Sequence, residues 1–110
     1  MKCFAANRVC RVADGSLLRN GAVEIDSVTH QVVRSFQLTE EIRQTEWKGG
    51  LILLCNVQPV RKEGENFQTF IDRLYLEEMK SDNVSQKAYH VTAFNVGSME
   101  FTTQSKIILL

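Results

Sequence analysis

The sequence is short of the features that mark specialised proteins. Its 110 residues include one proline and three cysteines, and 13 basic side chains balance 13 acidic ones. Zero net charge argues against nucleic acid or an anionic membrane as the main partner, because both attract a basic excess. It also removes the charge repulsion that keeps copies of a protein apart. The single proline, Pro59, argues against a flexible linker.

The cysteines and the apolar runs indicate the cellular compartment of the chain. Cys3, Cys10 and Cys55 are odd in number and form no CxxC pair, so they predict a reduced, cytoplasmic protein rather than a disulfide framework. Residues 1–12 lack the run of ~7–15 apolar residues of a signal peptide. The longest apolar run, Leu51–Cys55, suits a buried strand and is far shorter than the ~20 residues of a membrane span.

What is present is typical of a small globular domain. Apolar residues make up 44% of the chain and charged residues 24%, both ordinary values for such domains. The length falls in the usual domain range of ~100–150 residues, so we expect one domain spanning 1–110. A chain of this size can bury a core without metal ions or disulfides.

Apolar residues at alternate positions predict a mainly β fold. In the first segment, Phe4, Ala6, Cys10 and Val12 are expected to share one face of a strand. Strands are expected at 2–12, 21–26, 31–38, 88–96, 99–102 and 106–110, with a short helical turn at 39–45. Residues 46–54 are expected to be extended, with a bulge or a close backbone approach at Gly49-Gly50.

Three segments are expected to reverse the chain between these strands. Asp14-Gly15 is one turn signal, and Asn20-Gly21 is a stronger one because both residues tolerate positive φ. The short loop around 27–30 is expected to close a hairpin.

One segment has the spacing of an amphipathic helix. Asn66 is the expected N-cap, and Lys80 near the end suits the helix dipole. The expected fold class is therefore mainly β (α+β): a small β-sandwich or half-open barrel of N- and C-terminal strands, with one helix at about 66–80 between them. The apolar stripe of this helix consists of Phe67, Phe70, Ile71, Leu74, Tyr75 and Met79.

No catalytic or metal-binding pattern emerges. His30 and His90 lie in different segments without an HxH or HExxH motif, so partly solvated histidines are favoured over a metal site shared with Cys10. Cys55 follows a buried run, which favours a structural thiol over a nucleophile. The adjacent acidic pairs Glu40-Glu41 and Glu77-Glu78 are expected on the solvated surface.

The N-terminal half resembles a known family. The segments "FAANRVCRVADGSLLRNGAVEID", "VVRSFQL" and "EWKGGLILL" are similar to the opening of metal-dependent amidohydrolases. In that family a strand, a "GxVxID" phrase and a "PGLIxPG" strand precede a (β/α)₈ barrel. The segment "AYHVTAFNVGSMEFTTQSKIILL" is more loosely similar to the strands after the barrel. The resemblance implies the small flanking β-sandwich that these two ends form in the family.

The departures from the family exclude its chemistry. Where the family has a metal-binding HxH after the "PGLIxPG" strand, this chain continues with Cys55-Asn56-Val57-Gln58-Pro59. Only residues 55–87 lie between the two flanks, whereas the barrel needs ~250 residues. No catalytic residue, metal or cofactor is therefore expected.

Three functions remain open from the sequence. The first is a non-catalytic domain that acts by protein contact, as a homodimer or with an unidentified protein, because zero net charge and the apolar end 107–110 favour association. The second is a small-molecule binding module with a pocket between sheet and helix. The third is a small enzyme using Cys55 or His90. The candidate ligand or interface residues are Trp47, Phe70 and Tyr75.

Overall fold

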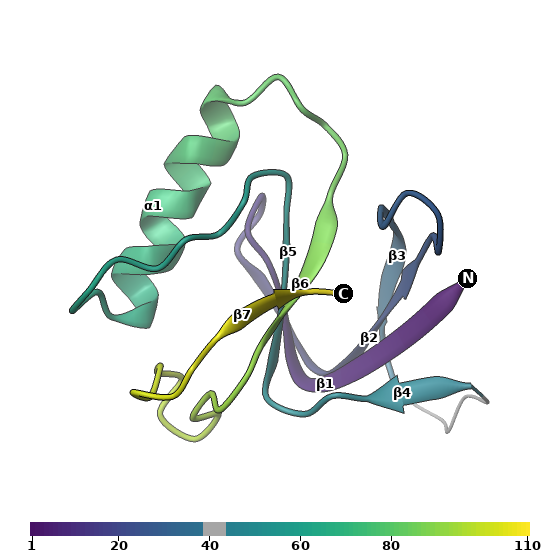
Figure 1. The fold of residues 1–110 in the computed structure, drawn as a ribbon, viewed down its shortest axis with the longest axis horizontal. Helices are drawn as coiled ribbons and strands as arrows, with labels where there is room; N and C mark the ends of the chain where they lie inside the picture. The colour runs from purple at the N-terminus through teal and green to yellow at the C-terminus, as the bar shows by residue number, and fades with distance from the viewer. Residues whose placement is uncertain (39–43) are drawn as a thin grey trace.

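The chain folds around one curved sheet, with a single described helix lying against one side of it (Figure 1). A computed structural model describes residues 1–38 and 44–110. The elements in chain order are β1 (Lys2–Arg11), β2 (Ser16–Ile25), β3 (Val32–Gln37), β4 (Thr45–Trp47), β5 (Leu51–Cys55), α1 (Phe67–Lys80), β6 (Lys87–Val91) and β7 (Ile107–Leu109).

Strand β1 is the hub of this sheet. Six of the seven strands follow the order β3-β2-β1-β5-β6-β7, and the seventh, β4, pairs with β1. The first half of β1 lies parallel to β4, and its second half lies parallel to β5. Its other edge pairs with β2 in an antiparallel hairpin. Strands from both ends of the sequence therefore share one sheet.

The sheet curls until β3, at one end of the strand order, lies beside the start of β6, the strand next to the other end. Gln31, just before β3, forms a bridge with Lys87 at the start of β6. Next to it, the backbone N–H of Val32 donates to the carbonyl of Gln86 at 2.7 Å. Strands β1, β2, β3, β6 and β5 thus enclose a common interior at this end. The expected mainly β class, a half-open barrel of N- and C-terminal strands with one helix, is confirmed.

Each face of the sheet has its own core. The strands of the barrel alternate between the two faces, because successive side chains of a strand point to opposite sides. The buried side chains inside the barrel are Phe4, Ala6, Val9, Val23, Ile25, Ile52, Leu54 and Ala88. Those on the helix side are Cys10, Val12, Leu51, Leu53, Cys55, Phe67, Phe70, Leu74, Val91, Phe94 and Phe101.

The β1–β2 hairpin changes face halfway along its length. Phe4 and Ala6 point into the barrel, but Cys10 packs on the helix side. The expectation that they share one face is wrong. The change falls at Asn7, which the register sets opposite Asn20, a residue with φ of 47°. Asn tolerates this conformation better than most residues, so the hairpin bends there.

Of the three expected turns, two are present and one is not. Asp14-Gly15 does form the turn between β1 and β2, where Asp14 Oδ1 accepts a hydrogen bond from the Ser16 N–H at 2.9 Å. Asn20-Gly21 is not a turn, because it lies within β2 at the bend. The expected hairpin between β2 and β3 is present, and Asp26 accepts hydrogen bonds from its loop.

The later elements depart from expectation in two places. The strand expected at 88–96 is wrong in its second half, because β6 ends at Val91. Segment 46–54 is extended as expected, and Gly49 and Gly50, both with positive φ, separate β4 from β5. Residues 99–102 are not a strand and contribute only an isolated bridge between Asn95 and Glu100. Most of the helical turn expected at 39–45 lies outside the described residues, while Thr45 belongs to β4.

Helix α1 begins and ends close to where the sequence predicts. The side chain of Asn66 caps it by accepting from the Thr69 N–H at 2.8 Å. Phe67, Phe70 and Leu74 are buried against the sheet. Within residues 1–38 and 44–110, no helix has both the length and the apolar character needed to cross a membrane.

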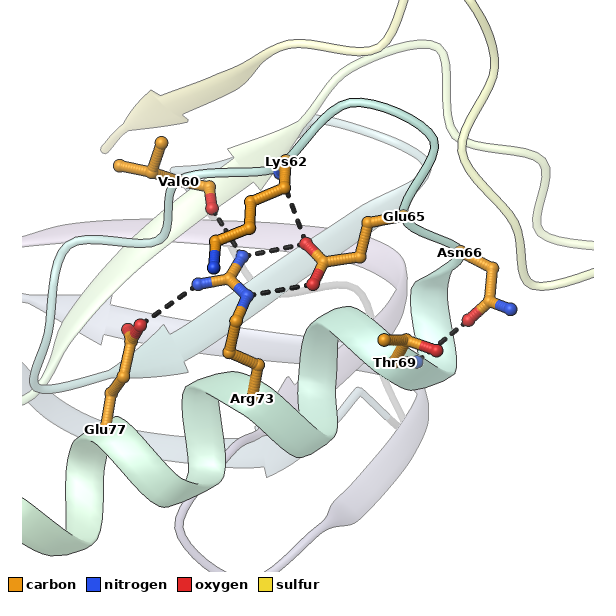
Figure 2. A network of polar contacts seen from close by, with 7 residues as sticks. All are labelled: Val60, Lys62, Glu65, Asn66, Thr69, Arg73 and Glu77. Carbon is orange, nitrogen blue, oxygen red and sulfur yellow. Dashed lines mark hydrogen bonds and ion pairs between the residues drawn. The ribbon is translucent and has the colours of Figure 1, made fainter.

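A network around Arg73 ties the loop before α1 to the helix (Figure 2). Arg73 Nε donates to Glu65 Oε2 and Nη2 donates to Glu65 Oε1, both at 2.8 Å. The same guanidinium reaches the carbonyl of Val60 at 2.6 Å and Glu77 at 3.0 Å. This two-point contact with Glu65 holds its pKa down at about 2.

Candidate ligand groove along helix α1

Helix α1 covers the sheet with only part of its apolar stripe. Phe70 and Leu74 are fully buried, whereas Tyr75 is 42% exposed and Met79 is 67% exposed. Tyr75 lies four residues after Ile71, so these two side chains share one side of the helix. That side faces the end of the β1–β2 hairpin across a hollow.

The hollow is a groove of about 650 Å³. This lies within the ~300–1,000 Å³ range of ligand sites in proteins. Helix α1 forms one wall, the β1–β2 hairpin another, and the loop after β6 closes one end. Its lining residues are Cys10, Val12, Ala13, Asp14, Gly15, Leu17, Phe67, Gln68, Ile71, Asp72, Tyr75, Ser98, Met99 and Glu100.

Every charged residue lining the groove is acidic. They are Asp14, Asp72 and Glu100, and no Lys or Arg lines it. Glu100 is held in place because its Oε1 accepts from the Phe67 N–H at 2.6 Å. The Ser16 backbone N–H, donating to Asp14, lowers the pKa of that carboxyl and keeps it ionised. The groove therefore combines apolar walls with negative charge.

A smaller pocket of about 210 Å³ adjoins the groove. Ala13 and Tyr75 line both hollows, so the two form one continuous depression. The other lining residues of the small pocket are Asn56, at the end of β5, and Glu78 and Met79, on the last turn of α1.

Glu78 is the unusual residue of this pocket. Its exposure is only 7%, and its Oε2 atom has no hydrogen-bond partner among the described residues. Burial raises the pKa of its carboxyl, the backbone N–H of Asn56 partly opposes this rise, and the nearby negative charge of Asp14 adds to it. Glu78 is the only buried charged residue of the described chain.

A second unpartnered oxygen lines the same pocket. Asn56 Oδ1 is buried and finds no hydrogen-bond donor in the described chain. The Asn56 amide nitrogen is used, because Nδ2 donates to the carbonyl of Asn83 at 2.6 Å. Buried oxygens without donors are costly, and native proteins rarely keep them without a reason. Two such oxygens on residues of one small pocket give it acceptors that a hydrogen-bond donor would satisfy.

The structure does not bring the three sequence candidates together. Tyr75 lines the groove and the small pocket. Phe70 is buried in the core beneath the helix and does not line the groove. Trp47 is 53% exposed on β4, away from the groove.

The sequence predicts that Glu78 lies on the solvated surface with Glu77, and this prediction is wrong for Glu78. Glu77 does lie there and pairs with Arg73. Helical spacing indicates the burial of Glu78, because it follows Phe67 by eleven positions and Leu74 by four and so lies on the buried side of the helix.

Cys55 and His90, the two candidate catalytic residues, do not line the groove. Burial raises the pKa of the Cys55 thiol to about 12, so it stays protonated at neutral pH. The thiol donates to the carbonyl of Val57 at 3.2 Å. His90 Nε2 lies 3.1 Å from the carbonyl oxygen of Gly49, and burial lowers the pKa of this ring.

The third group considered, Cys10 with His30 and His90, forms no metal site in the structure. Across residues 1–38 and 44–110, no three His, Cys, Asp or Glu side chains gather to hold a metal ion. His30 lies instead in the β2–β3 loop, where its Nδ1 is 3.0 Å from the carbonyl oxygen of Leu110.

Comparisons of the chain with protein-family models, with curated proteins and with solved structures found no match.

Proposed function

We propose that this chain is a non-catalytic β domain, similar to the flanking β domain of amidohydrolases, that acts by contact with a second copy of itself. The strand arrangement supports the similarity. Strand β5, which resembles the family's "PGLIxPG" strand, runs parallel beside β1, and the C-terminal strands β6 and β7 complete the same sheet. Cys3, Cys10 and Cys55 are all free thiols, which supports a reducing, cytoplasmic compartment.

The observation that carries the contact function is the edge strand β7. The backbone N–H of Leu110 donates to the carbonyl of Ala88, and that of Thr92 donates to the carbonyl of Lys106. In an antiparallel pair only every second residue bonds to the partner strand, so the N–H and C=O groups of Ile107 and Leu109 point away from β6. Ile108 is 50% exposed and Leu109 is 45% exposed. The strand carries no charge or proline, the usual guards of an edge.

Light scattering coupled to size-exclusion chromatography tests this function. We expect a dimer at tens of micromolar protein, and we expect Ile108→Lys to shift it to monomer because a charge then occupies the pairing edge. Val28→Lys is the matched control, since Val28 is 88% exposed in the β2–β3 loop. A wild-type chain that stays monomeric throughout would contradict the proposal.

A second candidate function is the binding of a small molecule. The groove of about 650 Å³ between α1 and the β1–β2 hairpin favours it. The groove has apolar walls and a few fixed polar groups, which is the usual make-up of a ligand site.

A further inference from the structure

The small pocket at the end of α1 has the chemistry of a cation site. Glu78 Oε2 and Asn56 Oδ1 are buried acceptors without donors. No Lys or Arg lines this pocket or the groove beside it. An occupant that carries hydrogen-bond donors would satisfy these two oxygens, and a positive charge suits the carboxyl of Glu78. The nearby Asp14 adds negative charge, although it also pairs with Arg11 at 3.4 Å.

The adjoining groove determines the chemistry of the part of the ligand that lies outside the small pocket. From the shared residues Ala13 and Tyr75, the depression continues between apolar side chains that include Val12, Leu17 and Ile71. An occupant that reaches from the pocket into the groove thus has an apolar body behind its charged end. Tyr75 stands at the junction, where an aromatic face favours a cation.

We propose that this depression binds a small primary amine with an apolar body, its ammonium group held by Glu78 Oε2 and Asn56 Oδ1 and its body lying along α1 in the groove. This proposal rests on the second candidate function, the binding of a small molecule. A primary ammonium fits because it offers three donors in a compact group to the two waiting oxygens. A metal ion fits less well, because the described residues do not supply a set of ligands for it.

The test is a titration of the ¹⁵N-labelled protein with three matched probes, followed by amide chemical shifts. The probes are 2-phenylethylamine, the neutral 2-phenylethanol and the anionic 3-phenylpropionate. We expect 2-phenylethylamine to shift the amides of Ala13, Asn56 and Tyr75, with a millimolar dissociation constant. The two other probes should bind at least about tenfold more weakly, because a hydrogen bond between charged groups is worth about that factor.

Variants assign the effect to the pocket. Glu78→Gln should weaken 2-phenylethylamine by about tenfold and bring it level with 2-phenylethanol. Glu77→Gln is the matched control, because Glu77 is the neighbouring acid and pairs with Arg73 outside the pocket. Ala13→Leu gives an independent check, since it narrows the junction of the two hollows and should weaken binding while leaving the pocket acids in place.

The possible outcomes distinguish the amine proposal from the small-molecule binding function on which it rests. Equal affinity for the amine and the alcohol, with shifts along the groove, would overturn the amine proposal and leave a small-molecule function standing. Amine binding that Glu78→Gln does not weaken would also overturn it. A crystal soaked in the amine that shows only water between Glu78 and Asn56 would overturn the amine proposal alone. No binding by any of the three probes would overturn both.

Discussion

Two glutamates near helix α1 respond to their surroundings in opposite ways. Glu65 is held by Arg73 through two hydrogen bonds of 2.8 Å, which lowers its pKa to about 2 from an ordinary value of 4.5. Glu78 is buried without a partner for Oε2, which raises its pKa. The first therefore stabilises the folded chain when it is ionised, and the second costs stability when it is ionised.

The Glu65 pair predicts a loss of stability in acid. Because the pKa of Glu65 is lowered on folding, its contribution is complete above pH 4.5 and disappears as the pH falls towards about 2. At neutral pH, Glu65→Gln should lower the free energy of unfolding by about 1–3 kcal/mol, and the difference from wild type should shrink below pH 4.5. Denaturant titrations across this pH range measure it. A difference that does not change with pH would contradict the role of the ion pair.

Glu78 predicts the opposite trend. In the unfolded chain this carboxyl ionises near its ordinary value of 4.5, whereas burial in the fold delays ionisation. Stability is therefore lost as the pH rises from 4.5 through the raised pKa. Glu78→Gln should become more stable relative to wild type between pH 4 and pH 7, as measured by denaturant titration. Glu77→Gln, the exposed neighbour, should show no such gain.

At the scale of elements, the bend of the β1–β2 hairpin shapes the whole sheet. Both strands change face where Asn7 lies opposite Asn20, and Asn7 Oδ1 also accepts from the Gly50 N–H at 2.8 Å. This single side chain thus ties the bend of β1 to the point where its parallel partner changes from β4 to β5. Gly21, next to the bend, allows the two strands to approach closely.

Gly21→Ala tests this close approach. A Cβ at Gly21 would lie 2.6 Å from Cγ2 of Val9, too close for any relaxed contact. We expect the variant to lose about 1–3 kcal/mol of unfolding free energy, measured by thermal or denaturant unfolding. Gly97→Ala is the control, because its Cβ would meet only Asn95 Oδ1 at 3.4 Å, and it should change stability by less than about 0.5 kcal/mol.

Local pattern predicted the elements better than their partners. Helix α1 was predictable because its cap and its buried spacing lie within one stretch of chain. The turn predicted at Asn20-Gly21 is wrong, because a positive φ occurs both in turns and in strand bends, and only the pairing of β1 with β2 distinguishes the two. The division of β4 from β5 likewise depends on both pairing with β1, which no local window contains.

The candidate groove could be predicted only in part. Tyr75 was selected because it belongs to the apolar stripe of α1, and it lines the groove. Phe70 belongs to the same stripe but faces the core, because the sheet covers that side of the helix. Asn56 and Glu78 gain their importance from contacts between the end of β5 and the end of α1, which lie far apart in sequence.

At the scale of the whole molecule, the two ends of the chain depend on each other. The barrel closes where the start of β3 meets the start of β6, through the bridge between Gln31 and Lys87. Leu110 lies at the same junction. Its backbone N–H donates to the carbonyl of Ala88 at 2.9 Å, and its carbonyl oxygen lies 3.0 Å from Nδ1 of His30. The N-terminal strands alone would leave the barrel interior open to water.

The central position of β1 also sets the order in which the protein can assemble. The β1–β2–β3 strands are neighbours in sequence and can form first, but the second half of β1 finds its partner only 43 positions later, where Asn7 meets Gly50. Pairing over such a distance is slow, because a long loop must close before any contact stabilises it. During synthesis, one edge of β1 therefore stays open until β5 has been made, and this early hairpin is the species most exposed to wrong pairing with another chain.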